Sequence, residues 1–189
     1  MVTLTDIDII QLLRKNNLNQ DTLQEDVVEK LKQRGLKVAT AESCTGGLIS
    51  ERITRVSGSS QVFDCGICSY ANQIKENVLG VQKDTLAVLG AVSAETAIQM
   101  AEGVKKLSGA DIGVSTTGIA GPTGGTAEKP VGLVFMGICT AEKAYAVKLM
   151  LGGAENRLNS RAYIRKLASD AALFTVLSEC YNSEKQQGI

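Results

Sequence analysis

A chain of 189 residues with 44% apolar composition is long enough to bury one core and too short for two comfortable domains. Its 20 basic and 20 acidic residues cancel, so no positive field favours long nucleic acid as a partner, although a small anionic ligand remains compatible. No histidine occurs, which excludes Ser-His-Asp and Cys-His catalysis and every metal site that needs imidazole.

The N-terminus and the cysteines favour a cytoplasmic protein. The opening residues, MVTLTDIDIIQLL, lack the basic region and uninterrupted apolar stretch of a secretory signal, and no later window has the length of a membrane span. The five cysteines are odd in number and irregularly spaced, which is typical of free thiols in a reducing compartment. We therefore expect no membrane partner.

The predicted elements alternate between helices and strands along the chain. Residues 1–20 indicate a short helix or arm, and Thr22 to Glu25 has capping-box spacing that opens a helix ending at Gly35. The later pattern predicts a strand at 37–41, a helix at 48–56, a strand at 62–70, short helices within 74–79 and 85–90, a helix at 93–107, a strand at 111–117, a glycine-rich loop at 118–129, a hairpin over 131–140 and 144–151, and a helix at 161–180. This alternation is typical of an α/β fold, with one domain over 21–182 and a tail at 183–189.

The first candidate segment for chemistry follows the strand at 37–41. Ser43 lies between that strand and a helix, so its hydroxyl could sit near N-terminal amides that would stabilise an oxyanion. Gly46 and Gly47 would let a ligand or another backbone approach closely. From position alone, however, Ser43 or Thr45 is more simply explained as a helix cap.

The second segment contains Tyr70, Asn72 and Lys75. Tyr70 closes a predicted strand and Lys75 lies in the next turns, so both could face a cleft at the same sheet edge. A solvated lysine is the ordinary alternative. To act as a base, Lys75 would have to be neutral, which requires desolvation or a neighbouring cation.

The third segment is the glycine-rich loop from Gly118 to Lys129. Successive glycines after a buried strand can present backbone N–H groups to a phosphate or carboxylate, with Thr117, Thr126 and Lys129 available to assist. No Gly-Lys-Ser/Thr follows, so this is not a P-loop, and a structural turn explains it about equally well.

The cysteines are predicted to have no chemical role. Cys65 and Cys68 have CxxC spacing but lie in a strand-like run without a second ligand pair, so we interpret them as core residues. Cys44 beside Ser43 could be reactive at a helix N-terminus, but a small buried hydrophobic residue is the favoured interpretation.

Several short motifs occur together and in order: Thr-Ala-Glu-Ser43-Cys-Thr-Gly-Gly, Gly58-Ser-Ser, Tyr70-x-Asn72-x-x-Lys75, Gly90-Ala-Val-Ser93, Thr117-Gly-Ile-Ala-Gly-Pro and Glu128-Lys-Pro-Val-Gly132. Over about residues 21–177 the chain thereby resembles the CinA C-terminal family, the nicotinamide-nucleotide amidases. Many members carry a large N-terminal domain that has no counterpart in these residues, so we expect a stand-alone form of the family.

The resemblance implies hydrolysis of nicotinamide mononucleotide to nicotinic acid mononucleotide and ammonia, without metal or organic cofactor. It also implies a three-layer α/β/α fold with a mixed, mostly parallel sheet, and assembly into a homodimer or higher homo-oligomer. The family's proposed serine nucleophile falls on Ser43, and its motif tyrosine and lysine fall on Tyr70 and Lys75. A chain without histidine needs such a Ser/Lys/Tyr device.

The family also uses an arginine before the last helix, but this sequence departs from the usual Gly-Asp-Arg turn. Counting back from the helix favours Arg161, and counting forward from Gly153 favours Arg157. We choose Arg161 for catalysis. The expected small-molecule nucleotide would contact Glu42, Cys44, Thr45, Gly46, Gly47, Asn72, Thr117, Gly118, Ala120, Gly121, Gly124, Gly125, Lys129 and Arg157.

Two other functions fit the same residues. A nucleotide-binding, competence-associated protein could keep the pocket without chemistry, and it would be stabilised by ligand without turnover. An amidase for another pyridine or nucleoside amide would differ only in its substrate.

Overall fold

The computed structural model describes residues 1–152 and 161–182 of the chain. Its elements follow in the order β1 (Thr3–Thr5), α1 (Asp6–Lys15), α2 (Leu23–Arg34), β2 (Val38–Glu42), α3 (Leu48–Thr54), a 3-10 turn (Ser59–Gln61), β3 (Phe63–Cys68), α4 (Asn72–Leu79), α5 (Lys83–Val88), α6 (Ala94–Ser108), β4 (Ile112–Gly118), β5 (Leu133–Cys139), β6 (Ala144–Met150) and α7 (Arg161–Asn182). Each strand and helix predicted after residue 20 is therefore present. None of the described helices combines the length and apolar character needed to cross a membrane.

The strands form a single sheet in the order β1-β6-β5-β4-β2-β3. β2 pairs in parallel with both β3 and β4, whereas β5 is antiparallel to β4 and to β6. β1 pairs in parallel with β6, so β5 alone runs against the other strands. The expected mixed, mostly parallel sheet is confirmed.

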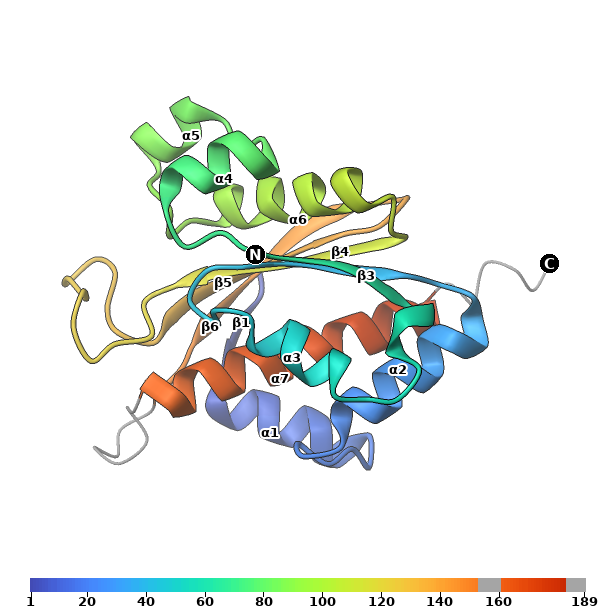
Figure 1. The fold of residues 1–189 in the computed structure, drawn as a ribbon. Coiled ribbons are helices and arrows are strands. Elements are labelled where there is room, and N and C mark those ends of the chain that lie inside the picture. Colours follow the sequence, from blue (N-terminus) through green and yellow to red (C-terminus); the bar gives the residue numbers. More distant parts are fainter. Residues whose placement is uncertain (153–160, 183–189) are drawn as a thin grey trace.

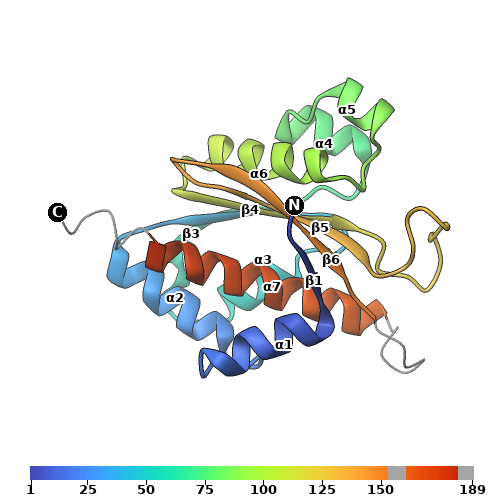
Figure 2. The same ribbon diagram turned by 180° about the vertical axis from the view of Figure 1, so that it is seen from behind.

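Helices cover both faces of this sheet. In Figure 1, α4, α5 and α6 lie on the upper face, and α1, α2, α3 and α7 lie on the lower face. Figure 2 shows the same layers from behind, with β1 at the edge of the sheet next to β6 and α1 below it. β4 and β5 are buried along nearly their whole length because both faces of the sheet are covered. The three-layer α/β/α fold is confirmed.

The start of the chain is integrated more fully than an arm would be. Residues 1–20 contain α1, as the sequence indicated, and also β1, which extends the sheet through pairs from Thr3 with Lys148 to Thr5 with Met150. The capping box forms at Thr5 and Asp8. The one predicted at Thr22 does not form, because the backbone there lies at φ −113°, ψ 2°, away from the extended conformation that an N-cap requires.

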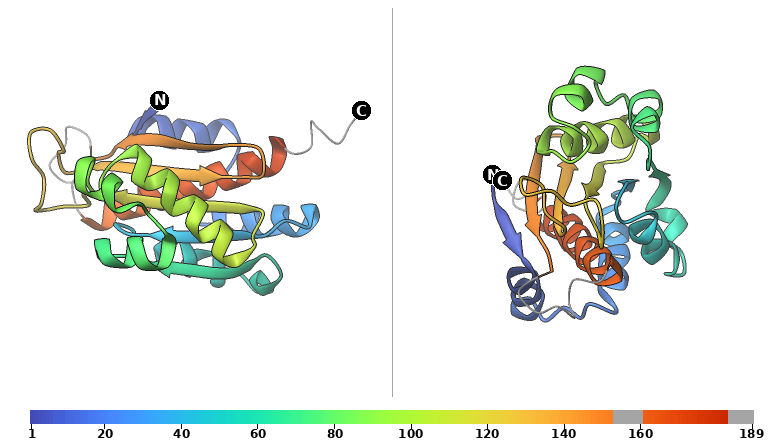
Figure 3. Two further views of the ribbon diagram at one scale, coloured as in Figure 1. Left: turned by 90° about the horizontal axis from the view of Figure 1, so that it is seen from above. Right: turned by 90° about the vertical axis from the view of Figure 1, so that its left-hand side faces the viewer.

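Helix α6 approaches the sheet closely, and α4 approaches α6. A Cβ at Gly113 of β4 or Gly137 of β5 would clash with the α6 backbone, and a Cβ at Gly103 of α6 would clash with the backbone of Leu79 in α4. Figure 3 shows α6 crossing the strands with α4 beside it. This close packing fixes α4 over the carboxyl ends of β2 and β3.

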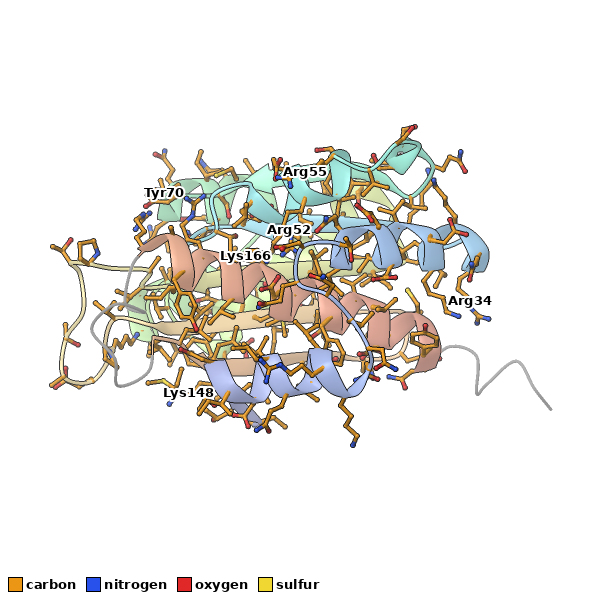
Figure 4. The ribbon with its side chains drawn as sticks, turned by 90° about the horizontal axis from the view of Figure 1, so that it is seen from below. Arg34, Arg52, Arg55, Tyr70, Lys148 and Lys166 are labelled. Atoms are coloured by element: carbon orange, nitrogen blue, oxygen red, sulfur yellow. The ribbon has the colours of Figure 1, made fainter. Side chains whose placement is uncertain are left out.

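A buried ionic network joins the lower helices. Arg52 of α3 and Asp170 of α7 form an ion pair at 2.7 Å, with 4% and 0% of their side chains exposed. The Arg52 guanidinium also donates to Ser169 Oγ, Gln24 Oε1 and the Gln20 carbonyl. Lys166 donates to Asp170 at 2.9 Å, and Figure 4 shows Arg52 and Lys166 in the middle of this layer. The network ties α3, and with it the turn after β2, to α7.

We expect Arg52→Met to lower the free energy of unfolding by about 3–5 kcal/mol, because it leaves the Asp170 carboxylate buried without its main partner. Arg55→Met is the matched control, since Arg55 makes an exposed pair with Glu51 and its loss should cost under about 0.5 kcal/mol. Urea unfolding of both variants measures the difference. Equal, small losses would show that the buried network contributes little.

Candidate active site

Three hydroxyl side chains lie in one row at the carboxyl ends of adjacent strands. Glu42 at the end of β2 pairs with Cys68 of β3 and with Thr116 of β4. Beyond this pair, Ser69 N donates to Glu42 O and Ser43 N donates to Thr116 O, so the hydrogen bonding between the strands continues for one more residue. Ser69, Ser43 and Thr117 are therefore neighbours. Ala41 and Ile67, two residues earlier, pack with the α4 and α6 core, which places this row on the upper face.

Lys75 of α4 reaches down to this row. Its Nζ lies 3.1 Å from Ser43 Oγ, 2.6 Å from the Ser69 carbonyl and 3.4 Å from the Tyr70 carbonyl. The lysine is only 1% exposed and is among the largest fully buried side chains. The structure thus brings together the serine and lysine that the sequence singled out, and it excludes the solvated alternative for Lys75.

The surroundings of Lys75 disfavour its charged form. Burial lowers the pKa of Lys75 below its ordinary value of 10.5, against a smaller opposing effect from the thiols of Cys44 and Cys68. No ion pair to Lys75 occurs within residues 1–152 and 161–182, so no carboxylate restores the charge. The amine can consequently be neutral at a lower pH than an exposed lysine.

A cavity of about 200 Å³ opens beside the serine and lysine. It lies where the carboxyl ends of parallel strands meet, the usual place for ligands in α/β proteins. The predicted residues that line it are Ser43, Cys44, Tyr70, Asn72, Lys75, Thr117, Gly118, Ala120 and Arg161. Ala91 and Val92 also line it. The sequence analysis assigned them no role, although the motif Gly90-Ala-Val-Ser93 that contains them was a signal that could have found them.

Glu42 and Thr45 hold the serine turn in place. The Glu42 carboxylate accepts hydrogen bonds from Ile49 N, Ser50 N and Ser50 Oγ at the start of α3. The Thr45 hydroxyl bonds to that of Thr116. Both residues are 0% exposed and neither lines the cavity, so their role in the structure is to support the turn, and their contact with substrate stays a prediction.

The helix-cap alternative for the serine turn is also excluded. The N-cap residue of α3 is Gly47, in the left-handed region, and the free amides of Ile49 and Ser50 bond to the Glu42 carboxylate rather than to Ser43 or Thr45. Gly46 N donates to Ser43 O, so that amide is already used within the turn. Arg165 of α7 donates to the Thr45 carbonyl at 2.6 Å and 3.1 Å, a contact that sequence reasoning missed because it joins residues 120 positions apart. Gly46 and Gly47 do not line the cavity.

Tyr70 and Arg161 form one side of the cavity mouth. Arg161 donates through one nitrogen to Tyr70 Oη at 2.9 Å and through another to the Gly121 carbonyl at 3.0 Å. Arg161 thereby links α7, the segment between β3 and α4, and the glycine-rich loop. Of the two arginines considered, Arg161 lies at the cavity, whereas Arg157 falls outside the described residues.

The glycines of the glycine-rich loop allow the loop to pack closely against itself. A Cβ at Gly121 or Gly125 would collide with Val131, and Gly124 has a positive φ of 87°. Lys129 Nζ donates to the Leu89 carbonyl at 2.8 Å. Gly121, Gly124, Gly125 and Lys129 do not line the cavity, so their contacts with a bound phosphate stay a prediction.

The cysteines differ in their surroundings. Cys44 is 5% exposed, and burial raises the pKa of its thiol to about 12, which confirms its interpretation as a small buried residue. The prediction of a core position is wrong for Cys68, which is exposed because β3 is an edge strand with alternating exposure. Cys65 is partly buried and packs against the core under α4 and α6. No cluster of three or more Cys, Asp or Glu suited to a metal occurs in the described part of the chain.

Comparison with known proteins places this architecture in one family. The model of the CinA C-terminal domain matches residues 20–180. A competence-damage inducible protein of Thermoanaerobacter pseudethanolicus is 53% identical over 150 residues, which are 79% of this chain and 36% of the relative. A CinA-like protein of Kosmotoga olearia is 53% identical over 145 residues, 77% of this chain and 35% of that protein. The chain thus spans about a third of the length of these relatives.

Solved structures agree with the sequence comparison. The competence/damage inducible protein CihA of Agrobacterium tumefaciens superposes with a TM-score of 0.79 at 40% identity, covering 84% of this chain and 94% of that one. A CinA superfamily protein of Klebsiella pneumoniae gives a TM-score of 0.80 at 29% identity, covering 87% and 99%. By sequence and by fold, the chain belongs to the CinA C-terminal domain family.

Proposed function

We propose that the cavity is the active site of an amidohydrolase that converts nicotinamide mononucleotide to nicotinic acid mononucleotide and ammonia. The observation that carries the proposal is the 3.1 Å approach of the buried Lys75 amine to Ser43 Oγ, with no carboxylate paired to it in the described chain. Serine with a neutral lysine replaces the histidine that this sequence lacks.

The neighbours of Lys75 suit a neutral amine. Such an amine has two protons and one lone pair, and the Ser69 and Tyr70 carbonyls can each accept one proton. The lone pair is then left for the Ser43 hydroxyl. In this state Ser43 donates its proton to Lys75, as a nucleophile must do to its base.

In the first half of the reaction, Ser43 Oγ attacks the carboxamide carbon while Lys75 takes the hydroxyl proton. The tetrahedral intermediate collapses as the carbon–nitrogen bond breaks, and Lys75 returns the proton to the departing ammonia. In the second half, water attacks the ester on Ser43 with Lys75 again accepting a proton. The ester bond breaks, the acid leaves, and Ser43 regains its proton, so no metal or organic cofactor is required.

The main-chain turn after Ser43 offers donors for the oxyanion. Within the described residues the amides of Cys44 and Thr45 make no bond to a backbone carbonyl, unlike those of Ser43 and Gly46, and their partner is the Cys44 sulfur, a weak acceptor that an oxyanion can replace. Backbone amides that are fixed before the reaction stabilise developing negative charge without reorganisation. Glu42 and Arg165, which hold the turn, therefore act as positioning residues.

The cavity size fits the reacting end of the substrate. At about 200 Å³ it is smaller than the usual ligand pocket of roughly 300–1,000 Å³, so it accommodates an aromatic carboxamide and leaves ribose and phosphate at the mouth. Arg161 lies at that mouth with guanidinium protons beyond those donated to Tyr70 and Gly121. It is the cation best placed to meet the phosphate.

The names of relatives support a second candidate. These names refer to competence and damage induction or to the CinA family, and to no reaction. A competence-associated protein that binds a nucleotide and does no chemistry would have the same cavity. Nicotinamide mononucleotide would then raise the melting temperature without releasing ammonia. A panel of other pyridine and nucleoside amides distinguishes an amidase with a different substrate.

We expect Ser43→Ala and Lys75→Met each to reduce ammonia release from nicotinamide mononucleotide by about 100-fold or more, since each removes one partner of the proton transfer. Ser60→Ala and Lys106→Met are the matched controls, because both residues are exposed and outside the cavity. An enzyme-coupled ammonia assay measures all four. Full activity of either site variant contradicts the mechanism.

The pH dependence of kcat/KM tests the protonation state of the base. Because the pKa of Lys75 is lowered, its neutral fraction increases with pH and is complete above that lowered value. We expect kcat/KM to increase with pH to a plateau, with its midpoint below 10.5. A value that falls steadily between about pH 7 and pH 10 would mean that the charged amine is the active form.

The same pKa shift also predicts an effect on stability. Between the lowered pKa of folded Lys75 and 10.5, the unfolded chain binds a proton at this residue that the folded chain does not. The free energy of unfolding of the wild type should therefore rise with pH relative to that of Lys75→Met. Urea unfolding from about pH 6 to pH 9.5 measures this difference, and a constant difference would indicate an unshifted lysine.

A further inference from the structure

The ring of Tyr70 is held at the cavity mouth from both ends. Its main chain follows β3, directly before α4, and its hydroxyl accepts a hydrogen bond from Arg161 of α7 at 2.9 Å. Arg161 is itself fixed by the Gly121 carbonyl. The residue is 62% exposed and is among those that line the cavity, so its ring is accessible to a ligand at the mouth. In Figure 4, Tyr70 lies at the end of the molecule where α7 begins.

The phenol is not what orients the base. Lys75 Nζ contacts the main-chain carbonyl of Tyr70, a group that any residue would supply, and the Tyr70 hydroxyl contacts Arg161 instead. The aromatic side chain is therefore available for a different task.

The charged groups around the cavity indicate which ligand the ring could recognise. Among the described residues that line it, the ionisable groups with a positive form are Lys75 and Arg161, and none is an aspartate or glutamate. A ligand with a positive ring therefore meets no anionic side chain there. An aromatic face is the other group that attracts a cation, through its quadrupole, and the attraction strengthens when water is excluded.

We propose that the face of the Tyr70 ring selects substrates whose carboxamide is attached to a positively charged ring. This inference rests on the proposed function. It adds the group by which the site would distinguish a pyridinium amide from a neutral aromatic amide of the same shape. In this role Tyr70 is a specificity residue whose ring contacts the substrate ring. Its hydroxyl fixes the position of the ring by accepting the hydrogen bond from Arg161.

Two probes isolate the charge. The 1-methyl-3-carbamoylpyridinium cation and neutral 3-methylbenzamide have nearly the same shape, and neither carries a ribose or phosphate. Their dissociation constants are measured by NMR titration in the full chain with Ser43→Ala, so that no turnover occurs. We expect the cation to bind about 5-fold or more tightly than the neutral probe, the range typical of one desolvated cation–aromatic contact.

Variants at residue 70 then test the ring itself. Tyr70→Phe keeps the aromatic face and loses only the hydroxyl bond to Arg161, so the preference for the cation should persist. Tyr70→Leu removes the face and should bring the two dissociation constants to within about 2-fold of each other. Melting temperatures of both variants confirm that each is folded, as expected for an exposed side chain.

The possible outcomes separate this inference from the proposed function. A preference that survives in Tyr70→Leu, or that is absent with Tyr70 in place, overturns the inference. Absence of ammonia release by the wild-type protein overturns the amidase function alone, because the binding ratio is measured without turnover.

Discussion

A primary amine buried without a counter-charge is the constraint on which the rest of this structure depends. An ammonium group taken from water into the interior is costly unless an anion accompanies it, and the described surroundings of Lys75 provide carbonyls, a hydroxyl and thiols in place of one. The fold thus stabilises the uncharged form of a side chain that is normally charged. Carbonyl acceptors then orient the neutral amine without stabilising its charge as strongly as a carboxylate would.

The surrounding packing keeps this arrangement closed. Glycines in β4, β5 and α6 let helices approach so closely that α4 rests over the strand ends, and Lys75 of that helix is left only 1% exposed. Below the sheet, Glu42 and Arg165 brace the turn that carries Ser43, and the Arg52 network anchors α3 to α7. The turn that carries Ser43 is therefore held by the lower helical layer, and Lys75 is held by the upper one.

The part of the chain shared with the CinA C-terminal domain family contains the candidate site. The relatives share the domain over about three quarters or more of this chain, although the chain covers only about a third of their own length. The geometry developed above concerns residues within that shared part, since the family model spans residues 20–180. Ser43, Tyr70, Lys75 and Arg161 all lie inside it.

The sequence alone determined the α/β class and the elements after residue 20, because hydrophobic periodicity and glycine punctuation are local signals. The pairing of Ser43 with Lys75 was an expectation that came from the resemblance of its ordered motifs to the CinA C-terminal family. The absence of histidine also directed attention to a lysine base. Only the tertiary structure decided which neighbours those residues have. Strand order made Ser69, Ser43 and Thr117 a row, buried Glu42 and Thr45 beneath the turn, left Cys68 on an exposed edge, and set Tyr70 against Arg161. Such contacts join residues as many as 120 positions apart, and their geometry depends on register and helix packing that no local pattern encodes.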